Sequence, residues 1–139
     1  MLNDDWVEQL PGASAVWRDD MVWYGPAGFG VARGLSAYRA GALAPMHAAM
    51  ADVRVDIEIL TCEGNFCGVL GHLNFMQVGE MLGEPAPASP RASRLRFGFH
   101  YRADGDELAE GYAMFDLPGL FAQWGIDLYA RAGGSAAAK

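Results

Sequence analysis

The chain has 139 residues, which is the size of one domain, because single domains usually run to roughly 100–200 residues. Hydrophobic residues make up 52% of the chain and aromatic residues 12%, so it can bury a core and lacks the composition of a disordered segment. The formal net charge is -7 and no window concentrates lysine and arginine, which argues against nucleic acid or anionic membranes as partners.

The two ends of the sequence carry no recognisable targeting signal. Residues 1–5 are acidic and no long apolar run follows, so neither a signal peptide nor a membrane-spanning helix is predicted, and we expect a cytoplasmic protein. Residues 133–139 read as a flexible tail or an expression scar. The sequence therefore predicts a single domain over residues 1–132.

The first third of the chain predicts helices around a short strand. A short helix is expected over residues 4–15, weakened by an internal proline and glycine, and a short strand over residues 21–24, ended by a glycine-rich turn. After Gly34, apolar residues recur at three- and four-residue steps as far as Met50, which is typical of an α-helix. Pro45 falls inside this pattern and is expected to kink or split the helix.

The middle and last thirds predict an antiparallel sheet and a terminal helix. Residues 53–59 alternate between apolar and charged, which predicts a half-buried strand with its apolar members inward. Residues 66–78 are apolar on both faces and contain glycines, which predicts a long, bent strand, and residues 79–93 read as a loop. In residues 94–102 the alternation returns, with arginines on the outer face. Asp104 and Gly105 then predict a hairpin, and a helix is expected after Asp116.

Cys62 and Cys67 flank a four-residue segment, so they could face each other at the neck of a hairpin. Without a secretory signal, two reduced thiols are the favoured interpretation and a disulfide is the alternative. Neither cysteine has companions at the spacing that zinc requires.

The order of these elements predicts the fold class. Helices come first, then an antiparallel meander, then a terminal helix, which is typical of an α+β domain with helices packed on one face of a curved sheet. Inside such a sheet we expect a pocket. Its inward set is predicted to be Leu95, Phe97, Phe99 and Tyr101, with Arg94, Arg96, His100 and Arg102 facing outward.

Several segments together resemble a known family. They are Trp23–Gly30, Arg33–Leu35, Tyr101–Gly105, and Asp116–Leu120 followed by Gln123–Gly125. In this order they are similar to the SnoaL-like polyketide cyclase family, which belongs to the nuclear transport factor two-like superfamily. The resemblance covers roughly residues 20–131. It implies a cone-shaped α+β barrel with an open, mainly apolar cavity, often dimeric, that works with side chains and no cofactor.

The resemblance implies less about the reaction, because one fold can host unrelated activities. Aldol cyclases of this family carry an inward histidine on the penultimate strand and an inward aspartate on the last strand. Aligned on Arg102 and Asp116, these two positions fall on Phe99 and Ala113, which are apolar here. The specific aldol-cyclase mechanism is therefore not predicted, and a small Ala113 leaves room for a bulkier apolar substrate.

Asp116 and Tyr24 are candidate proton-transfer groups. Asp116 stands at the start of the last helix, where it acts either as a general base at the pocket floor or as a structural N-cap. The Tyr24 hydroxyl would orient a substrate oxygen or donate a proton, unless its ring belongs to the core. Trp23 alternates with Tyr24, so only one of the two points inward.

His72 and Asn74 interrupt the most apolar strand two residues apart, so they share a face. Facing a cavity they would supply a base and an amide donor, while the alternative is a polar pair on the outer surface or in a dimer interface. His100 is expected on the outer face. His47 either edges the pocket mouth or lies on the surface.

The functional prediction is a cofactor-free enzyme that acts on a small apolar molecule with carbonyl or hydroxyl groups by isomerisation, cyclisation or dehydration. The alternative is a non-catalytic binding protein of the same fold. No phosphate loop, metal-ligand spacing or nucleophile elbow is recognisable, so no cofactor or metal is predicted. The expected partners are a small ligand and a second copy of the chain. The candidate catalytic residues are Asp116, His72 and Tyr24, and the candidate substrate-binding residues are Trp23, His47, Asn74, Met76, Phe99 and Ala113.

Overall fold

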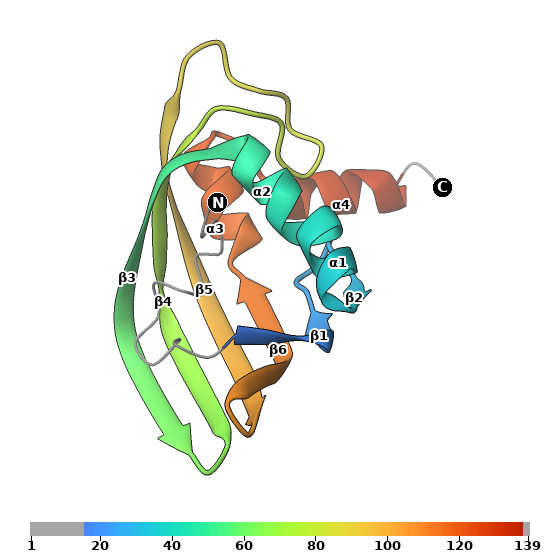
Figure 1. Ribbon diagram of the computed structural model, residues 1–139. Coiled ribbons are helices and arrows are strands. Elements are labelled where there is room, and N and C mark those ends of the chain that lie inside the picture. The colour runs from blue at the N-terminus through green and yellow to red at the C-terminus, as the bar shows by residue number, and fades with distance from the viewer. Residues whose placement is uncertain (1–15, 138–139) are drawn as a thin grey trace.

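The computed structural model describes residues 16–137. Its centre is a six-stranded sheet in the order β2-β1-β6-β5-β4-β3, strongly curved, with helices against its concave side (Figure 1). Neighbouring strands are antiparallel except β1 and β6, which pair in parallel. The α+β class is confirmed, with a mixed, open sheet. The strands are β1 (Val16–Tyr24), β2 (Val31–Arg33), β3 (Met50–Glu63), β4 (Phe66–Gln77), β5 (Arg91–Asp104) and β6 (Glu107–Phe115).

The predicted helix after Gly34 forms in three pieces. It consists of α1 (Leu35–Tyr38), a π-helical segment η2 (Arg39–Leu43) and α2 (Ala44–Ala49). Pro45 lies in the first turn of α2, directly after the π-helical segment, and its missing backbone N–H interrupts the helical series of hydrogen bonds there. The proline therefore splits the helix, as expected. The helix predicted for residues 4–15 lies outside the described residues.

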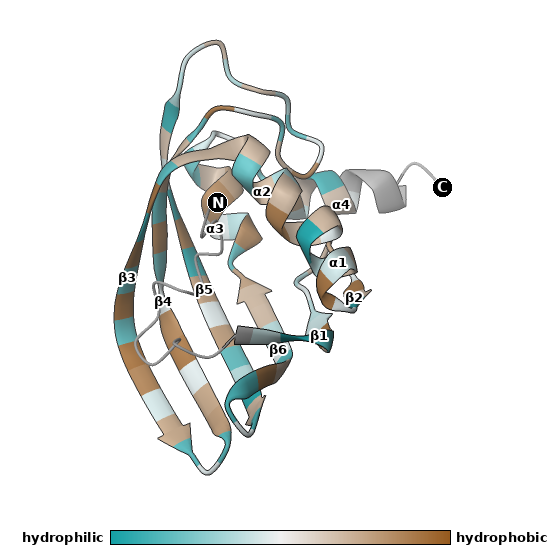
Figure 2. Ribbon diagram, viewed as in Figure 1, coloured by the Kyte–Doolittle hydropathy of each residue, from teal (hydrophilic) through white to brown (hydrophobic). Residues whose placement is uncertain are grey.

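The inner face of the sheet carries the core. In β5 the side chains of Leu95, Phe97, Phe99 and Tyr101 are all at most 6% exposed, while Arg94 and Arg96 are exposed. Figure 2 shows the resulting alternation of hydrophilic and hydrophobic residues along the strands. The inward and outward sets predicted for this strand are confirmed.

Strand β3 contains two β-bulges. Its predicted alternation holds from Val53 to Ile57, which pack against the core, and is reversed only after the second bulge. Asp52 and Val53 together oppose one residue of β4, and a second shift in register falls between Ile57 and Ile59. After the second bulge Ile59 pairs with an outer-face residue and is 53% exposed. The expectation that Ile59 is inward is therefore wrong, because one inserted residue reverses the face of everything that follows. Gly71 allows the close approach of the bulged strand, since a Cβ there would lie 2.1 Å from the Asp56 carbonyl oxygen.

The hairpin between β3 and β4 corrects the expectation of free thiols. Cys62 and Cys67 are directly opposite each other in the register and form a disulfide, with their Cα atoms 4.1 Å apart. The turn at Gly64, whose φ is 60°, brings the two strands together. The sequence predicts the hairpin geometry correctly. The missing secretory signal favours reduced thiols, but it says nothing about the distance between the two cysteines.

The C-terminal part has two helices where one was predicted. Helix α3 (Leu117–Gln123) follows β6 directly, and α4 (Leu128–Ala137) includes the first residues of the segment expected to be flexible. The loop after β4 is shorter than predicted, because β5 begins at Arg91. Within residues 16–137 no helix is long and apolar enough to cross a membrane.

Candidate functional site

Aromatic side chains pack against one another between the sheet and the helices. We call Trp17, Trp23, Tyr38, Phe99 and Tyr101 the aromatic interior; all five are at most 9% exposed. Their rings meet at centroid distances of 5.2–6.4 Å, in the tilted and edge-on arrangements that aromatic pairs prefer.

A glycine makes room for this packing. Gly111 on β6 pairs with Trp23 of β1 on one side and Tyr101 of β5 on the other. A Cβ on Gly111 would lie 2.8 Å from the ring of Trp17. The next inner residue of β6, Ala113, pairs with Phe99 and is equally small. Small residues on β6 therefore let large rings from three other segments meet above it.

One hydrogen-bond donor of the aromatic interior is buried without an acceptor in the described part of the chain. The indole Nε1 of Trp23 is buried and has no partner among the described residues. Burial raises the pKa of the Tyr101 phenol. Like an ordinary tyrosine, whose pKa is about 10, it is protonated at neutral pH and can donate. A buried donor without an acceptor costs roughly 1–3 kcal/mol, so a ligand oxygen here would relieve an existing penalty.

The structure separates the residues that were expected to share one cavity. His72, Asn74 and Met76 lie on the outer face of β4, opposite Arg96, Arg94 and Ala92 of β5. The residues between them along β4, Leu73 and Phe75, are at most 3% exposed and face inward. The expected cavity wall formed by His72 and Asn74 together with Phe99 and Ala113 is therefore corrected to two opposite faces.

On the outer face both polar residues of β4 lie beside carboxylates of β3. The Nδ1 atom of His72 lies 2.6 Å from Glu58 Oε1, although the two groups are not aligned for a hydrogen bond. Asn74 Nδ2 donates to Asp56 Oδ2 at 2.7 Å. The polar pair on the outer surface is thus the arrangement that forms.

Tyr24 also faces outward, where its ring stacks on Tyr112 with a centroid distance of 4.7 Å. Tyr112 donates to Glu110, which raises the pKa of this tyrosine. Arg102 and Tyr112 together lower the pKa of the Glu110 carboxyl. Trp23, the neighbour of Tyr24, is the residue of that pair that points inward, at 1% exposure.

Asp116 and His47 lie elsewhere. Asp116 is exposed and its Oδ1 accepts from the backbone N–H of Gly119 at 3.0 Å, so it caps helix α3. His47 is exposed on α2. Of the predicted site residues, the structure brings Trp23, Phe99 and Ala113 together on the inner face, and Asn74 and Met76 on the outer face. No group of three or more metal-ligating side chains gathers within the described residues.

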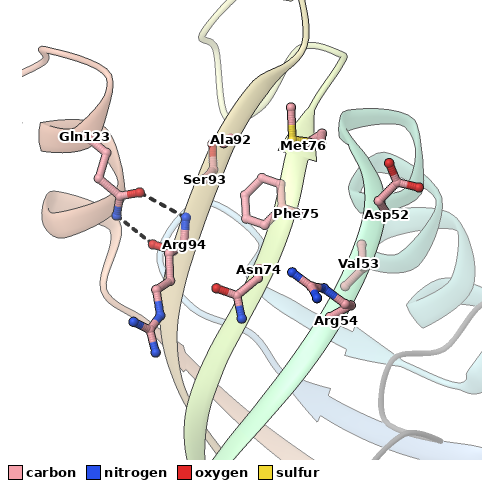
Figure 3. Close-up of a pocket in the computed structure, with 10 residues that line it drawn as sticks. All are labelled: Asp52, Val53, Arg54, Asn74, Phe75, Met76, Ala92, Ser93, Arg94 and Gln123. Carbon is pink, nitrogen blue, oxygen red and sulfur yellow. Dashed lines mark hydrogen bonds between the residues drawn. The ribbon is translucent and has the colours of Figure 1, made fainter.

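The outer face contains a groove of about 720 Å³ across β3, β4 and β5, beside α3 (Figure 3). We call it the outer groove. Its polar lining is Asp52, Arg54, Asn74, Ser93, Arg94 and Gln123, and its apolar lining is Val53, Phe75, Met76 and Ala92.

The α3 side of the outer groove is fixed by one amide. Strand β5 extends beyond the end of β6, and beyond that point it has no strand partner on this side. The side chain of Gln123 takes the place of such a partner. Its Oε1 accepts from the Arg94 backbone N–H at 2.9 Å, and its Nε2 donates to the Arg94 carbonyl oxygen at 2.6 Å. The Arg94 backbone N–H and carbonyl oxygen therefore both have hydrogen-bond partners, as they would beside another strand.

With this geometry established, comparison with known proteins identifies the family. The family model described as a SnoaL-like domain matches residues 5–111, which is well over half of the chain. The chain belongs to the SnoaL-like family. No curated protein matches it.

Solved structures agree with the SnoaL-like fold. A candidate SnoaL-like polyketide cyclase from Jannaschia sp. CCS1 superimposes with a TM-score of 0.69 at 18% identity, covering 78% of this chain and 72% of that one. IdmH, a candidate polyketide cyclase from Streptomyces antibioticus, gives a TM-score of 0.65 at 17% identity, covering 80% and 83%. A candidate isomerase from Rhodopseudomonas palustris gives 0.61 at 16% identity, covering 78% and 77%. At these identities the likeness concerns the fold.

Sequence reasoning did not single out Tyr101 or Arg54 as site residues. The strand pattern placed Tyr101 inward, and that position alone marks it as a polar group in an apolar interior. Arg54 belongs to a regular alternation in the sequence, and nothing in its neighbours signals a bulge.

Proposed function

We propose that this SnoaL-like domain binds a small, largely apolar molecule with a carbonyl or hydroxyl group in its aromatic interior. We further propose that it acts on this molecule without a cofactor, by the proton transfers of isomerisation, cyclisation or dehydration. The observation that carries the proposal is the unpartnered Nε1 of buried Trp23. A carbonyl or hydroxyl oxygen of a ligand would accept this hydrogen bond while apolar rings enclose the rest of the molecule.

Tyr101 supplies the second part of the argument. Its ring lies in the same interior, against Phe99, and burial raises the pKa of its phenol, which is protonated at neutral pH. A neutral phenol can donate a hydrogen bond to a substrate oxygen that gains negative charge when a base takes a proton from the neighbouring carbon. That base has to come from outside the aromatic interior. The names of the cyclases and the isomerase with the same fold are consistent with chemistry of this type.

Binding without catalysis is the second candidate, and one observation favours it. The buried polar residues of the described chain are Gln77 and Ser93, with no carboxylate or imidazole among them. A proton transfer needs a base as well as a donor. Catalytic roles for His72, Asp116 and Tyr24 would require a substrate that reaches the outer face or the helix cap.

Deuterium exchange separates the two candidates. A panel of apolar cyclic ketones and matched hydrocarbons is titrated while tryptophan fluorescence reports binding, and NMR in D₂O follows exchange of the hydrogens next to the carbonyl group. We expect ketones to bind more tightly than hydrocarbons and to exchange faster with protein than without it. Binding without exchange would establish the non-catalytic alternative, and equal binding of ketone and hydrocarbon would contradict the role of the donors.

Variants locate the site. Tyr101→Phe removes only the hydroxyl, and we expect it to lower the exchange rate about 10²-fold or more, the usual contribution of a positioned acid or base. Phe99→Ala should change which ketones bind. If His72→Ala or Asp116→Asn lowered exchange while Tyr101→Phe did not, the reaction would take place outside the aromatic interior.

We also propose that the domain forms a homodimer through the outer face of its sheet. Exposed apolar residues of three strands form one row there: Ile59, Leu70 and Met114 are 53%, 37% and 58% exposed. A row of this kind on an otherwise polar face is typical of a surface that is covered in the assembled protein.

A further inference from the structure

The outer groove combines features that the proposed function does not use. It lies on the face of the sheet opposite the aromatic interior, so a molecule bound in one does not occupy the other. Its volume of about 720 Å³ falls within the roughly 300–1,000 Å³ that is usual for small-ligand sites. We propose that the outer groove is a binding site for a small organic monocarboxylate with an apolar body.

Two arginines face each other across the groove. The register places Arg54 opposite Asn74, and Asn74 opposite Arg94, on three adjacent strands. Figure 3 shows Asn74 between the two arginine side chains. In the described part of the chain no carboxylate lies within 4.0 Å of either guanidinium, in contrast to Arg18, Arg102 and Arg131.

The first bulge of β3 creates this juxtaposition. Ala51 pairs with Met76 and Arg54 with Asn74, so two residues of β3, 52 and 53, stand opposite one residue of β4. Ala51 pairs with Met76, which lies on the outer face. Counted from Ala51 in a strand without a bulge, Arg54 would point to the inner face. The bulge turns its charge to the outer face instead.

Asp52 carries the conformational cost of the bulge. Its φ is 54°, in the left-handed region that non-glycine residues seldom adopt. Bulges and such backbone outliers are found preferentially beside functional sites, where they redirect a side chain. The strained residue of this bulge itself lines the groove.

The charges near the groove favour one negative charge over two. The lining carries two guanidiniums and one carboxylate, that of Asp52, which leaves an excess of one positive charge. Asp56, whose carboxylate accepts from the amide of Asn74, is not part of the lining. A monocarboxylate matches this small positive excess and the planar donor pairs of arginine. A phosphate dianion would meet stronger repulsion from the two aspartates. The side chains of Met76 and Ala92, paired on the outer face, supply apolar surface for the rest of the ligand.

The test uses three probes that share one aromatic ring: benzoate, phenyl phosphate and benzyl alcohol. Binding to the full chain is followed by calorimetry and by the arginine Nε–H and glutamine amide signals in ¹⁵N NMR. We expect benzoate to bind at least tenfold more tightly than benzyl alcohol, with shifts at Arg54, Arg94 and Gln123. Added salt should weaken benzoate binding, because the groove is open to solvent.

The double variant Arg54→Gln/Arg94→Gln should weaken benzoate binding at least tenfold. Arg39→Gln, which removes an exposed arginine from η2, is the matched control and should leave it unchanged. Ketone binding in the aromatic interior should be the same in all three proteins, so failure here and failure of the proposed function are distinguishable.

Three results would overturn the proposal. Equal benzoate affinity in the wild type and the double variant would show that the arginines do not form the site. Tighter binding of phenyl phosphate than of benzoate would show that the wrong anion class was chosen. A double variant that changed only the oligomeric state, with no benzoate binding in either protein, would show that a second copy of the chain covers the groove.

Discussion

The pKa values of Tyr101 and Tyr112 are both raised, but for different reasons. Burial raises the pKa of Tyr101, whereas the hydrogen bond to Glu110 is the main cause of the raised pKa of Tyr112. Only Tyr101 faces the interior, at 6% exposure. Its hydroxyl group is thus available to a molecule that enters the aromatic interior, while that of Tyr112 is already engaged.

This difference predicts a pH dependence. Above the ordinary tyrosine pKa of about 10, the unfolded chain loses phenolic protons before the folded chain does, so the free energy of unfolding falls as pH rises. The stabilisation from the raised pKa of Tyr101 is therefore complete below that pH and is lost as pH rises through the folded pKa. We expect Tyr101→Phe to make the alkaline decline shallower, leaving the share of Tyr112. Urea unfolding of both proteins at neutral and alkaline pH measures this, and equally steep declines would contradict it.

Asp116 is expected to act on the stability of α3. Its carboxylate accepts from Gly119 N at 3.0 Å, and loss of an N-cap acceptor usually costs about 0.5–2 kcal/mol. Asp116→Ala should lower the free energy of unfolding by that amount, whereas Asp116→Asn should retain most of it, because asparagine caps nearly as well. Chemical denaturation measures both. Equal stability of Asp116→Ala and the wild type would show that the cap contributes nothing.

The orientation of His72 and Asn74 shows that a single sequence cannot always decide which face of a strand points inward. The spacing predicted correctly that the two share a face. Because residues 66–78 are apolar on both sides, no contrast in polarity indicates which face is inward. In β5 the arginines supply that contrast, and the prediction there was confirmed. Candidate site residues were therefore assignable on β5 and ambiguous on β4.

At the level of elements, β3 and β4 depend on each other through their irregularities. The bulges of β3 redirect Arg54 and Ile59, and β4 accommodates the closer backbone with Gly71. The sequence predicted the strands, their hairpins and a bend at the glycines. It did not predict the bulges, because residues 53–59 alternate regularly and the extra residue is visible only in the pairing.

Gly71 should be intolerant of any side chain. A Cβ at this position would lie 2.1 Å from the backbone oxygen of Asp56, whereas Gly41 in η2 has nothing within 4 Å. We expect Gly71→Ala to destabilise the fold by about 1–3 kcal/mol through overpacking. Gly41→Ala is the control and should be neutral or stabilising by up to about 1 kcal/mol. Thermal and urea unfolding compare the two, and a Gly71→Ala protein as stable as the wild type would show that β3 can move away.

At the scale of the whole molecule, the two faces of the sheet differ in character. Its inner face is closed by helices and aromatic rings, and its outer face remains open, with acidic residues on β3 and basic residues on β5. The apolar row between these charges is continuous, since Leu70 and Met114 approach each other above Gly98, each 3.2 Å from the position of a Cβ there. Two such faces packed about a twofold axis would bring acidic strands against basic ones.

We therefore expect a dimer at micromolar concentration, measured by light scattering coupled to size-exclusion chromatography. Leu70→Glu and Met114→Glu each place a charge in the apolar row and should shift the protein to monomer while leaving its circular dichroism unchanged. Tyr129→Glu on α4 is the matched control, because Tyr129 is 77% exposed and lies on α4, outside the sheet. The row lies about four residues along β4 from Asn74, or roughly 13 Å at 3.3 Å per residue, so the outer groove should stay open at the edge of the interface. A monomeric wild type, or a dimer that survives both substitutions, would show that this face is not the interface.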